Sequence, residues 1–414
     1  MSTLIKNLAL LALSLLVALV LAELALRAFF PRYEYAAGSV HERDAGRLIV
    51  RRPSSSYTRP HPDSGVRHPV IHNNLALRQH RDVPLEKPPG EVRIGVFGDS
   101  FTENPRVPAP YAFTEVLDYL LNTTRPGFNV LNFGVDGYAT DQAWLYAHSA
   151  PAATSLDVVL YVFAANDVRG LYENDLLALG PDGAIVRKPP PPVAWWVPWL
   201  SRLHLTYLAL DVRNRIQGAG DAGEAYDPLE ARVLAEMRDA RDRRTRDATS
   251  EAIAGDLKRG EVSARSEGWV DLLLAIAGRW RDDVEADGGR FYVVLLPRPK
   301  EGLAEPLFRD FQVINLWRGF EEAGIEPQAW RFQKDGHWNE LGNQAAAILL
   351  YERLARDLDL PALDRAALER ALGTWYTSFD AGWSPTRFVE PVELDPQRAA
   401  ALRQRYVPLE QEAR

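Results

Sequence analysis

The sequence predicts an α/β fold in which a parallel sheet is covered by helices on both faces. Apolar runs of strand length, such as Val92–Phe97 and Val158–Phe163, recur along the chain and alternate with stretches of helix length. These runs end in small or polar residues, as parallel strands do when they deliver side chains to the edge of a sheet. Alternating strands and helices imply right-handed crossovers and a three-layer α/β/α arrangement.

The composition is that of a globular chain that can bury a sizeable core. Its 414 residues are 46% hydrophobic and 25% charged, which excludes a disordered chain. The 56 Asp and Glu residues outnumber the 48 Lys and Arg residues, and the formal net charge of -8 argues against nucleic acid as a partner. The chain has no cysteine, which excludes disulfides and thiolate metal sites.

Residues 1–30 contain the longest apolar stretch. The run 8–22 has one polar residue, and if Arg27 snorkels the span reaches about 20 residues, enough to cross a bilayer. We expect an uncleaved, single-pass anchor in the cytoplasmic membrane rather than a cleaved signal peptide, although 20–22 would be a tolerable cleavage site. Basic residues flank both ends of the span, so their count does not fix its orientation.

Residues 31–90 are rich in Pro, Ser, Arg and His and lack sustained periodicity. This composition predicts a juxtamembrane stalk and lead-in to the folded domain. Four of the histidines in this segment, His61, His68, His72 and His80, invite comparison with a metal site. No regular ligand spacing joins them, so we expect solvated loop histidines rather than a metal site.

Residues 91–360 carry the alternating pattern and form the predicted main domain. The predicted strands are Val92–Phe97, Val130–Phe133, Val158–Phe163 and Phe291–Leu296. The predicted helices lie near Phe113–Leu121, Asp141–Ala150, Gly268–Glu285 and Gly342–Arg356. Ligands bind at the carboxyl ends of such strands, and Ser100, Gly137 and Asn166 all come shortly after a strand.

Two further regions depart from the alternation of strands and helices. The segment at about 171–262 interrupts this alternation, which predicts an insertion over the active edge of the sheet. Its Trp195, Trp196 and Trp199 would suit sugar stacking or a membrane surface, but we favour packing under the insertion. Residues 361–414 form a C-terminal extension whose aromatic residues predict that it packs back on the domain.

Four short blocks follow one another in a recognisable order. Gly98-Asp99-Ser100 follows the first strand and places Ser100 like a nucleophile, which would need a base and donors for an oxyanion. Downstream lie a glycine-bearing turn at 132–137, Ala-Ala-Asn-Asp at 164–167, and Asp-Gly-His-Trp at 335–338. Together the blocks resemble those of the SGNH (GDSL) hydrolase superfamily, over roughly residues 65–357.

The resemblance implies a catalytic triad and an oxyanion hole. Ser100 would attack an acyl carbonyl, His337 would take and return the proton, and Asp335 would orient the imidazole. The expected oxyanion donors are the backbone amides of Ser100 and Gly137 and the side-chain amide of Asn166.

Two of these assignments have alternatives. Gly134 competes with Gly137 as the backbone donor, unless Gly134 serves a turn that needs a positive φ. Asn166 could instead cap the helix that follows its strand, a common role of Asn.

The sequence departs from the superfamily pattern in two places. Ala164 stands where a glycine usually begins the Asn-bearing block. One residue separates Asp335 from His337, where many members have two, and this Asp-x-His-Trp form is similar to that of alginate-type O-acetylation proteins. Hydrolysis and acyl transfer therefore both stay open.

The resemblance implies a membrane-anchored serine esterase acting on acyl esters, foremost O-acetyl esters, of cell-envelope glycans, with its domain facing the periplasm or the exterior. The alternative enzyme is an O-acetyltransferase of an exported polysaccharide that uses the same triad and excludes water. A non-catalytic module that binds a glycan or partner protein is a second alternative, and an unrelated α/β domain with coincidental motifs is a third. We expect no cofactor, because the sequence has neither a nucleotide-binding glycine loop nor a credible metal-ligand pattern.

Overall fold

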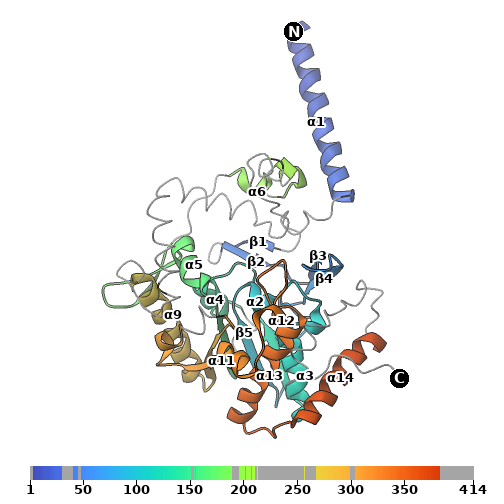
Figure 1. Ribbon diagram of the computed structural model, residues 1–414. Coiled ribbons are helices and arrows are strands. Elements are labelled where there is room, and N and C mark those ends of the chain that lie inside the picture. Colours follow the sequence, from blue (N-terminus) through green and yellow to red (C-terminus); the bar gives the residue numbers. More distant parts are fainter. Residues whose placement is uncertain are drawn as a thin grey trace.

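The computed structural model places a long N-terminal helix, α1 (Thr3–Phe29), so that it projects from a body of helices around a sheet (Figure 1). The structure describes residues 3–29, 41–44, 48–150, 155–188, 267–298 and 304–382, with parts of 195–212 and the single residues 153 and 256.

The central sheet has five parallel strands among the described residues, in the order β11-β10-β7-β5-β6. Their bounds are β5 (Val92–Phe97), β6 (Phe128–Asn132), β7 (Val158–Phe163), β10 (Arg290–Leu295) and β11 (Gln312–Asn315). Numbered along the chain, this order is 2-1-3-4-5, the flavodoxin-like arrangement, which has its switch point between the first and third strands. Ser100 follows β5 and Asn166 follows β7, so both lie at the switch point.

Helices cover both faces of the sheet (Figure 1). Side chains alternate between two buried clusters, so that Val96 belongs to one and Phe97 to the other. The first cluster lies under α3 (Phe113–Thr124), α11 (Leu316–Glu322) and α13 (Glu340–Asp357), and the second under α4 (Thr140–Ala147), α5 (Asn166–Asn174) and α9 (Glu267–Ala286). The prediction of a three-layer α/β/α fold with a parallel sheet is confirmed.

The predicted elements lie close to the observed ones, but the edge strand β11 was not predicted. It has four residues and a single buried side chain, Ile314, so it lacks the apolar run that identifies a central strand.

The N-terminal segment packs on the domain instead of forming a separate stalk over its described part. It contains two short hairpins, β1 (His41–Asp44) with β2 (Leu48–Arg51), and β3 (Ser55–Pro60) with β4 (Arg67–His72). The prediction of solvated histidines is wrong for the three that are at most 3% exposed: His61, His68 and His72. Each of them has a partner in the domain that offsets the cost of burying a polar ring.

The insertion and the C-terminal extension are described in part. A small hairpin of β8 (Leu177–Leu179) and β9 (Ile185–Arg187) follows α5, and most of 210–266 lies outside the described residues. The predicted packing of the insertion's tryptophans is wrong for the three that are 44–81% exposed: Trp195, Trp196 and Trp199.

The C-terminal helix α14 (Arg365–Gly382) packs back on the domain, as predicted. Trp375 donates a hydrogen bond to the carbonyl oxygen of Pro110 at 3.0 Å, and Tyr376 is buried in the first core cluster. The rest of the extension, residues 383–414, lies outside the described residues.

One described helix is long and apolar enough to cross a membrane. Its candidate span, Leu4–Phe29, has 26 residues, and at about 1.5 Å per residue it exceeds the thickness of about 30 Å of a bilayer's hydrocarbon core. Signal sequences have a similar length and composition, so these two properties alone do not fix the role of the helix.

Candidate active site

A sharp turn after β5 delivers Ser100 to the edge of the sheet. Gly98 permits the turn, because a Cβ there would lie 2.3 Å from Oγ1 of Thr102 and 2.9 Å from the carbonyl oxygen of Val162. Asp99 then caps the short helix α2 (Ser100–Glu103) by accepting the amide hydrogen of Phe101 at 2.9 Å. Ser100 is thus the first residue of a helix at the carboxyl end of the sheet.

The structure brings Ser100, His337 and Asp335 together. The Oγ atom of Ser100 lies 2.7 Å from Nε2 of His337, although the two residues are 237 positions apart. The Nδ1 atom of His337 faces Oδ1 of Asp335 at short hydrogen-bond distance, and the same oxygen accepts the backbone amide of His337 at 2.9 Å. This contact excludes the alternative of coincidental motifs that lie far apart.

A buried arginine that the sequence did not single out completes this chain of contacts. Nε of Arg106 donates to Oδ2 of Asp335 at 2.7 Å, while the opposite oxygen of that carboxylate serves His337. Burial acts against ionisation of Asp335, but His337 and Arg106 together lower its pKa below the usual value. Asp335 is therefore a carboxylate over the whole working range of pH.

The environment of His337 favours its neutral form. Burial lowers the pKa of His337 below its usual value, and the positive charge of Arg106 acts in the same direction, against the opposing effect of Asp335. The ring of Phe101 stacks on the imidazole with centroids 4.4 Å apart, and the guanidinium of Arg298 lies 4.5 Å from the centroid of Phe101. A neutral imidazole held beside a serine hydroxyl can act as a general base.

Asn166 does not cap the helix that follows it. It is the first residue of α5, the preceding Ala165 occupies the cap position, and the exposed amide of Asn166 donates to Oδ2 of Asp99 at 3.1 Å. Because an amide nitrogen carries two hydrogens, this bond leaves one for an oxyanion. Asp99 thereby links the serine helix to the Asn-bearing block.

The two glycines of the second block have different roles. Gly134 lies against the serine helix, because a Cβ there would come within 2.2 Å of the backbone nitrogen of Glu103. Its amide donates to Oδ1 of Asn132, and its φ is not positive, so the predicted alternative of a positive-φ turn is wrong for Gly134. Gly137 instead has a φ of 84° and open space around it, which leaves its backbone approachable. This contrast favours Gly137 over Gly134 as the backbone donor.

Glu103 holds the helix of Ser100 in position through contacts with the N-terminal segment. Its role was not predicted from the sequence. Its carboxylate is fully buried and accepts two bonds from Arg51, at 3.0 and 2.6 Å, and lies 3.0 Å from Nε2 of His72. It also accepts the backbone amide of Asp136 from the second block. Burial opposes ionisation, yet Arg51 and His72 lower the pKa of Glu103 well below its usual value. One feature of the sequence could have indicated this role. Glu103 lies in a short block that must be buried at the edge of the sheet, and a buried carboxylate needs charged partners.

The loop that carries Asp335 is held by the same N-terminal segment. The carboxylate of Asp63 accepts the backbone amides of Gln333 and Lys334 at 2.9 and 3.1 Å. Nε2 of His61 lies 2.9 Å from Oε1 of Glu340, at the start of α13. The N-terminal segment therefore contacts the loop before Asp335 through Asp63 and the start of α13 through His61. It contacts the helix of Ser100 through Arg51 and His72.

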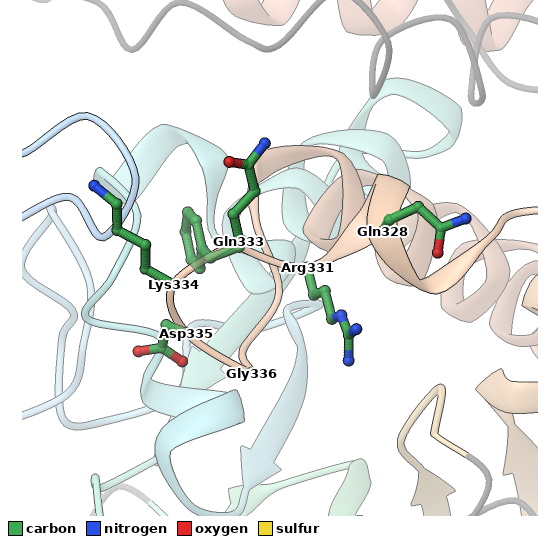
Figure 2. Close-up of a pocket in the computed structure, with 7 residues that line it drawn as sticks. Gln328, Arg331, Gln333, Lys334, Asp335 and Gly336 are labelled. Carbon is green, nitrogen blue, oxygen red and sulfur yellow. The ribbon is translucent and has the colours of Figure 1, made fainter.

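A surface pocket of about 440 Å³ lies beside this loop (Figure 2). It is lined by Gln328, Arg331, Phe332, Gln333, Lys334, Asp335 and Gly336. Its lining includes Asp335 but not Ser100 or His337, so it adjoins the triad without enclosing it. Within the described ranges, no group of three or more His, Asp or Glu residues is arranged to hold a metal ion.

Comparisons with protein families and with curated proteins find no match. Among solved structures, the chain is similar to a lipolytic G-D-S-L family protein from Veillonella parvula, with 14% identity, coverage of 64% of this chain and 99% of that one, and a TM-score of 0.32. TesA has 10% identity, with 64% and 98% of the chains covered and a TM-score of 0.33. A catalytic mutant of an acetylxylan esterase from Geobacillus stearothermophilus has 11% identity, with 66% and 96% covered and a TM-score of 0.30. All three similarities are distant, with identities of 10–14% and TM-scores of 0.30–0.33.

Proposed function

We propose that this protein is a membrane-anchored SGNH-type serine esterase that removes acyl groups, foremost O-acetyl groups, from cell-envelope glycans. The contact between Oγ of Ser100 and Nε2 of His337 at 2.7 Å, backed by Asp335, carries the proposal. A hydroxyl, an imidazole and a carboxylate in this order are what nucleophilic acyl transfer needs.

The reaction follows from the protons that these atoms can exchange. Ser100 Oγ attacks the acyl carbonyl carbon while Nε2 of His337 takes the hydroxyl proton, and Asp335 stabilises the resulting imidazolium. The oxyanion of the tetrahedral intermediate accepts hydrogen bonds from the amides of Ser100 and Gly137 and the side chain of Asn166. His337 then gives its proton to the leaving alcohol, and water releases the acyl group from Ser100 with the same base.

The substrate class and location follow from the family resemblance and from helix α1. The family resemblance supports an acyl ester of an envelope glycan and a domain outside the cytoplasm, and the apolar helix α1 supports a membrane anchor. The acetylated xylan named for one distant structural relative is a glycan ester of this kind.

Covalent labelling with a fluorophosphonate tests the proposal directly. In the purified full chain we expect one adduct at Ser100, read by intact mass and peptide mapping. The adduct should vanish in Ser100→Ala and in His337→Ala. The matched control is His148→Ala, which removes an exposed histidine that pairs with Asp283. A folded chain that is not labelled would contradict the esterase proposal and favour the binding module.

Product analysis separates hydrolysis from transfer. With an acetyl ester as donor and a polysaccharide as acceptor, an esterase releases acetate in proportion to the donor consumed. Acetate far below the donor consumed, together with acetylated polysaccharide, would instead favour the O-acetyltransferase with the same triad.

A further inference from the structure

The part of the insertion around α6 (Val197–Leu200) is fastened to the end of the apolar helix α1. The carboxylate of Glu23, on α1, accepts the backbone amides of His204 and Leu205 at 3.0 and 2.9 Å. Arg27, one turn further along α1, pairs with Glu23 at 2.8 Å and donates to the carbonyl oxygen of Arg202 at 3.0 Å. Figure 1 shows α6 on the side of the domain from which α1 projects.

This fastened segment presents a dense group of exposed aromatic side chains. Trp195 is 81% exposed, Trp196 44% and Trp199 69%, and Leu200 beside them is 38% exposed. Such a group on a chain in water signals an interaction surface. Tryptophan is the residue enriched where a membrane meets water, since its ring is apolar and its N–H reaches a polar partner.

The bonds to Glu23 fix the level of this segment relative to a bilayer. From Leu8 to Leu21 the side chains of α1 are exposed and, apart from Ser14, apolar, so the span requires hydrocarbon at least up to that level. Leu24 and Phe29, which are 57% and 77% exposed, continue the apolar surface beyond Glu23. At about 1.5 Å per residue, Glu23 lies roughly 3 Å and Arg27 roughly 9 Å beyond Leu21. Each interfacial layer of a bilayer is roughly 5–8 Å thick. The backbone amides of His204 and Leu205, bonded to Glu23, are therefore held within the interface. Arg202, bonded to Arg27, lies at its outer edge, three residues from Trp199.

We propose that residues 195–200 and 202–205 form an interfacial platform, in which Trp195, Trp196 and Trp199 insert among the lipid headgroups of the leaflet from which α1 emerges. The proposal rests on the proposed membrane anchor. The platform would give the domain a second contact with the membrane and so restrict its rotation about α1. Continuity with the apolar span favours a lipid surface over a sugar as the occupant.

The chain has no cysteine, which permits single-site labelling without a background. Trp199→Cys is labelled with nitrobenzoxadiazole in the full chain, reconstituted in phosphatidylcholine vesicles that carry a headgroup-level nitroxide quencher. Leu13→Cys, on α1 and 57% exposed, reports the span, and Leu85→Cys, on the domain and 49% exposed, is the matched surface control. We expect quenching at position 199 to exceed that at position 85 by at least twofold, with a blue-shifted emission.

The three probes separate the platform from the anchor. The expected lipid contact at position 13 is read with a second nitroxide placed deep in the acyl chains. If the probe at position 13 contacts lipid while the probe at position 199 is quenched no more than the probe at position 85, the platform alone would be overturned. No lipid contact at position 13 would overturn the anchor and the platform together, while fluorophosphonate labelling of Ser100 still decides the esterase. A response of position 199 to an acetylated oligosaccharide, without lipid quenching, would assign the tryptophans to glycan binding and overturn the proposal.

Discussion

Removing the positive charge of Arg106 is expected to shift the pH dependence of the reaction. Arg106 contacts Asp335 at 2.7 Å on the side away from His337, so its charge acts on the imidazolium across the carboxylate. His337 must be neutral to accept the proton of Ser100, and the cation helps to hold its pKa below the usual value. In Arg106→Met the pKa of His337 rises, and the acid limb of the kcat/KM profile moves to higher pH.

The size of the shift follows from Coulomb's law. At a separation of roughly 6 Å and an effective dielectric constant of about 20, one unit charge changes the free energy of the imidazolium by about 3 kcal/mol, or about two pKa units. Water that enters the vacated space screens part of this effect, so we expect a shift of about one pH unit. The plateau of kcat/KM also falls, by about 10- to 100-fold, because Asp335 loses a partner that fixes its position.

The assay is hydrolysis of p-nitrophenyl acetate from pH 5 to 9, with the spontaneous rate subtracted. Arg106→Lys keeps the charge and should keep the acid limb in place even if the plateau falls. Arg59→Met removes another buried arginine, which lies 3.5 Å from Asp136, and should shift the limb much less. An equal shift in Arg106→Lys and Arg106→Met, or none in either, would refute the electrostatic reasoning.

Three further predictions concern the two glycines, a buried histidine and the side-chain oxyanion donor. Gly134→Ala should lower the free energy of unfolding by about 3 kcal/mol, because the added Cβ clashes with the backbone of Glu103. Gly137→Ala should lower it by only about 1–2 kcal/mol, because of the positive φ at that position. Equal urea midpoints of the two variants would contradict this difference. Burial lowers the pKa of His68 to about 3, so the unfolded state binds more protons below pH 6.5, and the free energy of unfolding should fall by about 2 kcal/mol between pH 6.5 and 5. His68→Gln should weaken that dependence, and an unchanged slope would assign it to other groups. Asn166→Ala should lower kcat by about 10²–10³-fold with little change in KM, whereas a change in KM alone would remove Asn166 from the oxyanion hole.

The central sheet could be predicted because its strands are buried on both faces. Val158–Phe163 is a continuous apolar run of strand length, Val92–Phe97 is one interrupted only by Arg93, and their carboxyl ends place Ser100 and Asn166 at one edge. The edge strand β11 is half exposed, so it carries no comparable signal. Local pattern thus identified the strands that form the core and missed the strand that borders it.

The order of the blocks indicated which residues to examine, but not how they are held. The contacts of Arg106 with Asp335, and of Asp63 with the loop at 333–334, join positions more than 200 residues apart. Sequence spacing contains no information on such pairs, because they depend on which loops the sheet brings to the same edge. The histidines at 61, 68 and 72 were expected in solvent for the same reason.

The N-terminal segment therefore belongs to the same domain as the candidate active site. The serine helix α2 has only four residues, too few to be stable by its own hydrogen bonds, so its position depends on tertiary contacts. Glu103 supplies them through Arg51 and His72, which lie before the predicted domain boundary at residue 91. A chain that begins at that boundary would leave Glu103 as a buried carboxylate without its cation, which typically costs about 3–5 kcal/mol. The helix of Ser100 thus requires the residues from Arg51 onward, and the boundary of the domain lies before them.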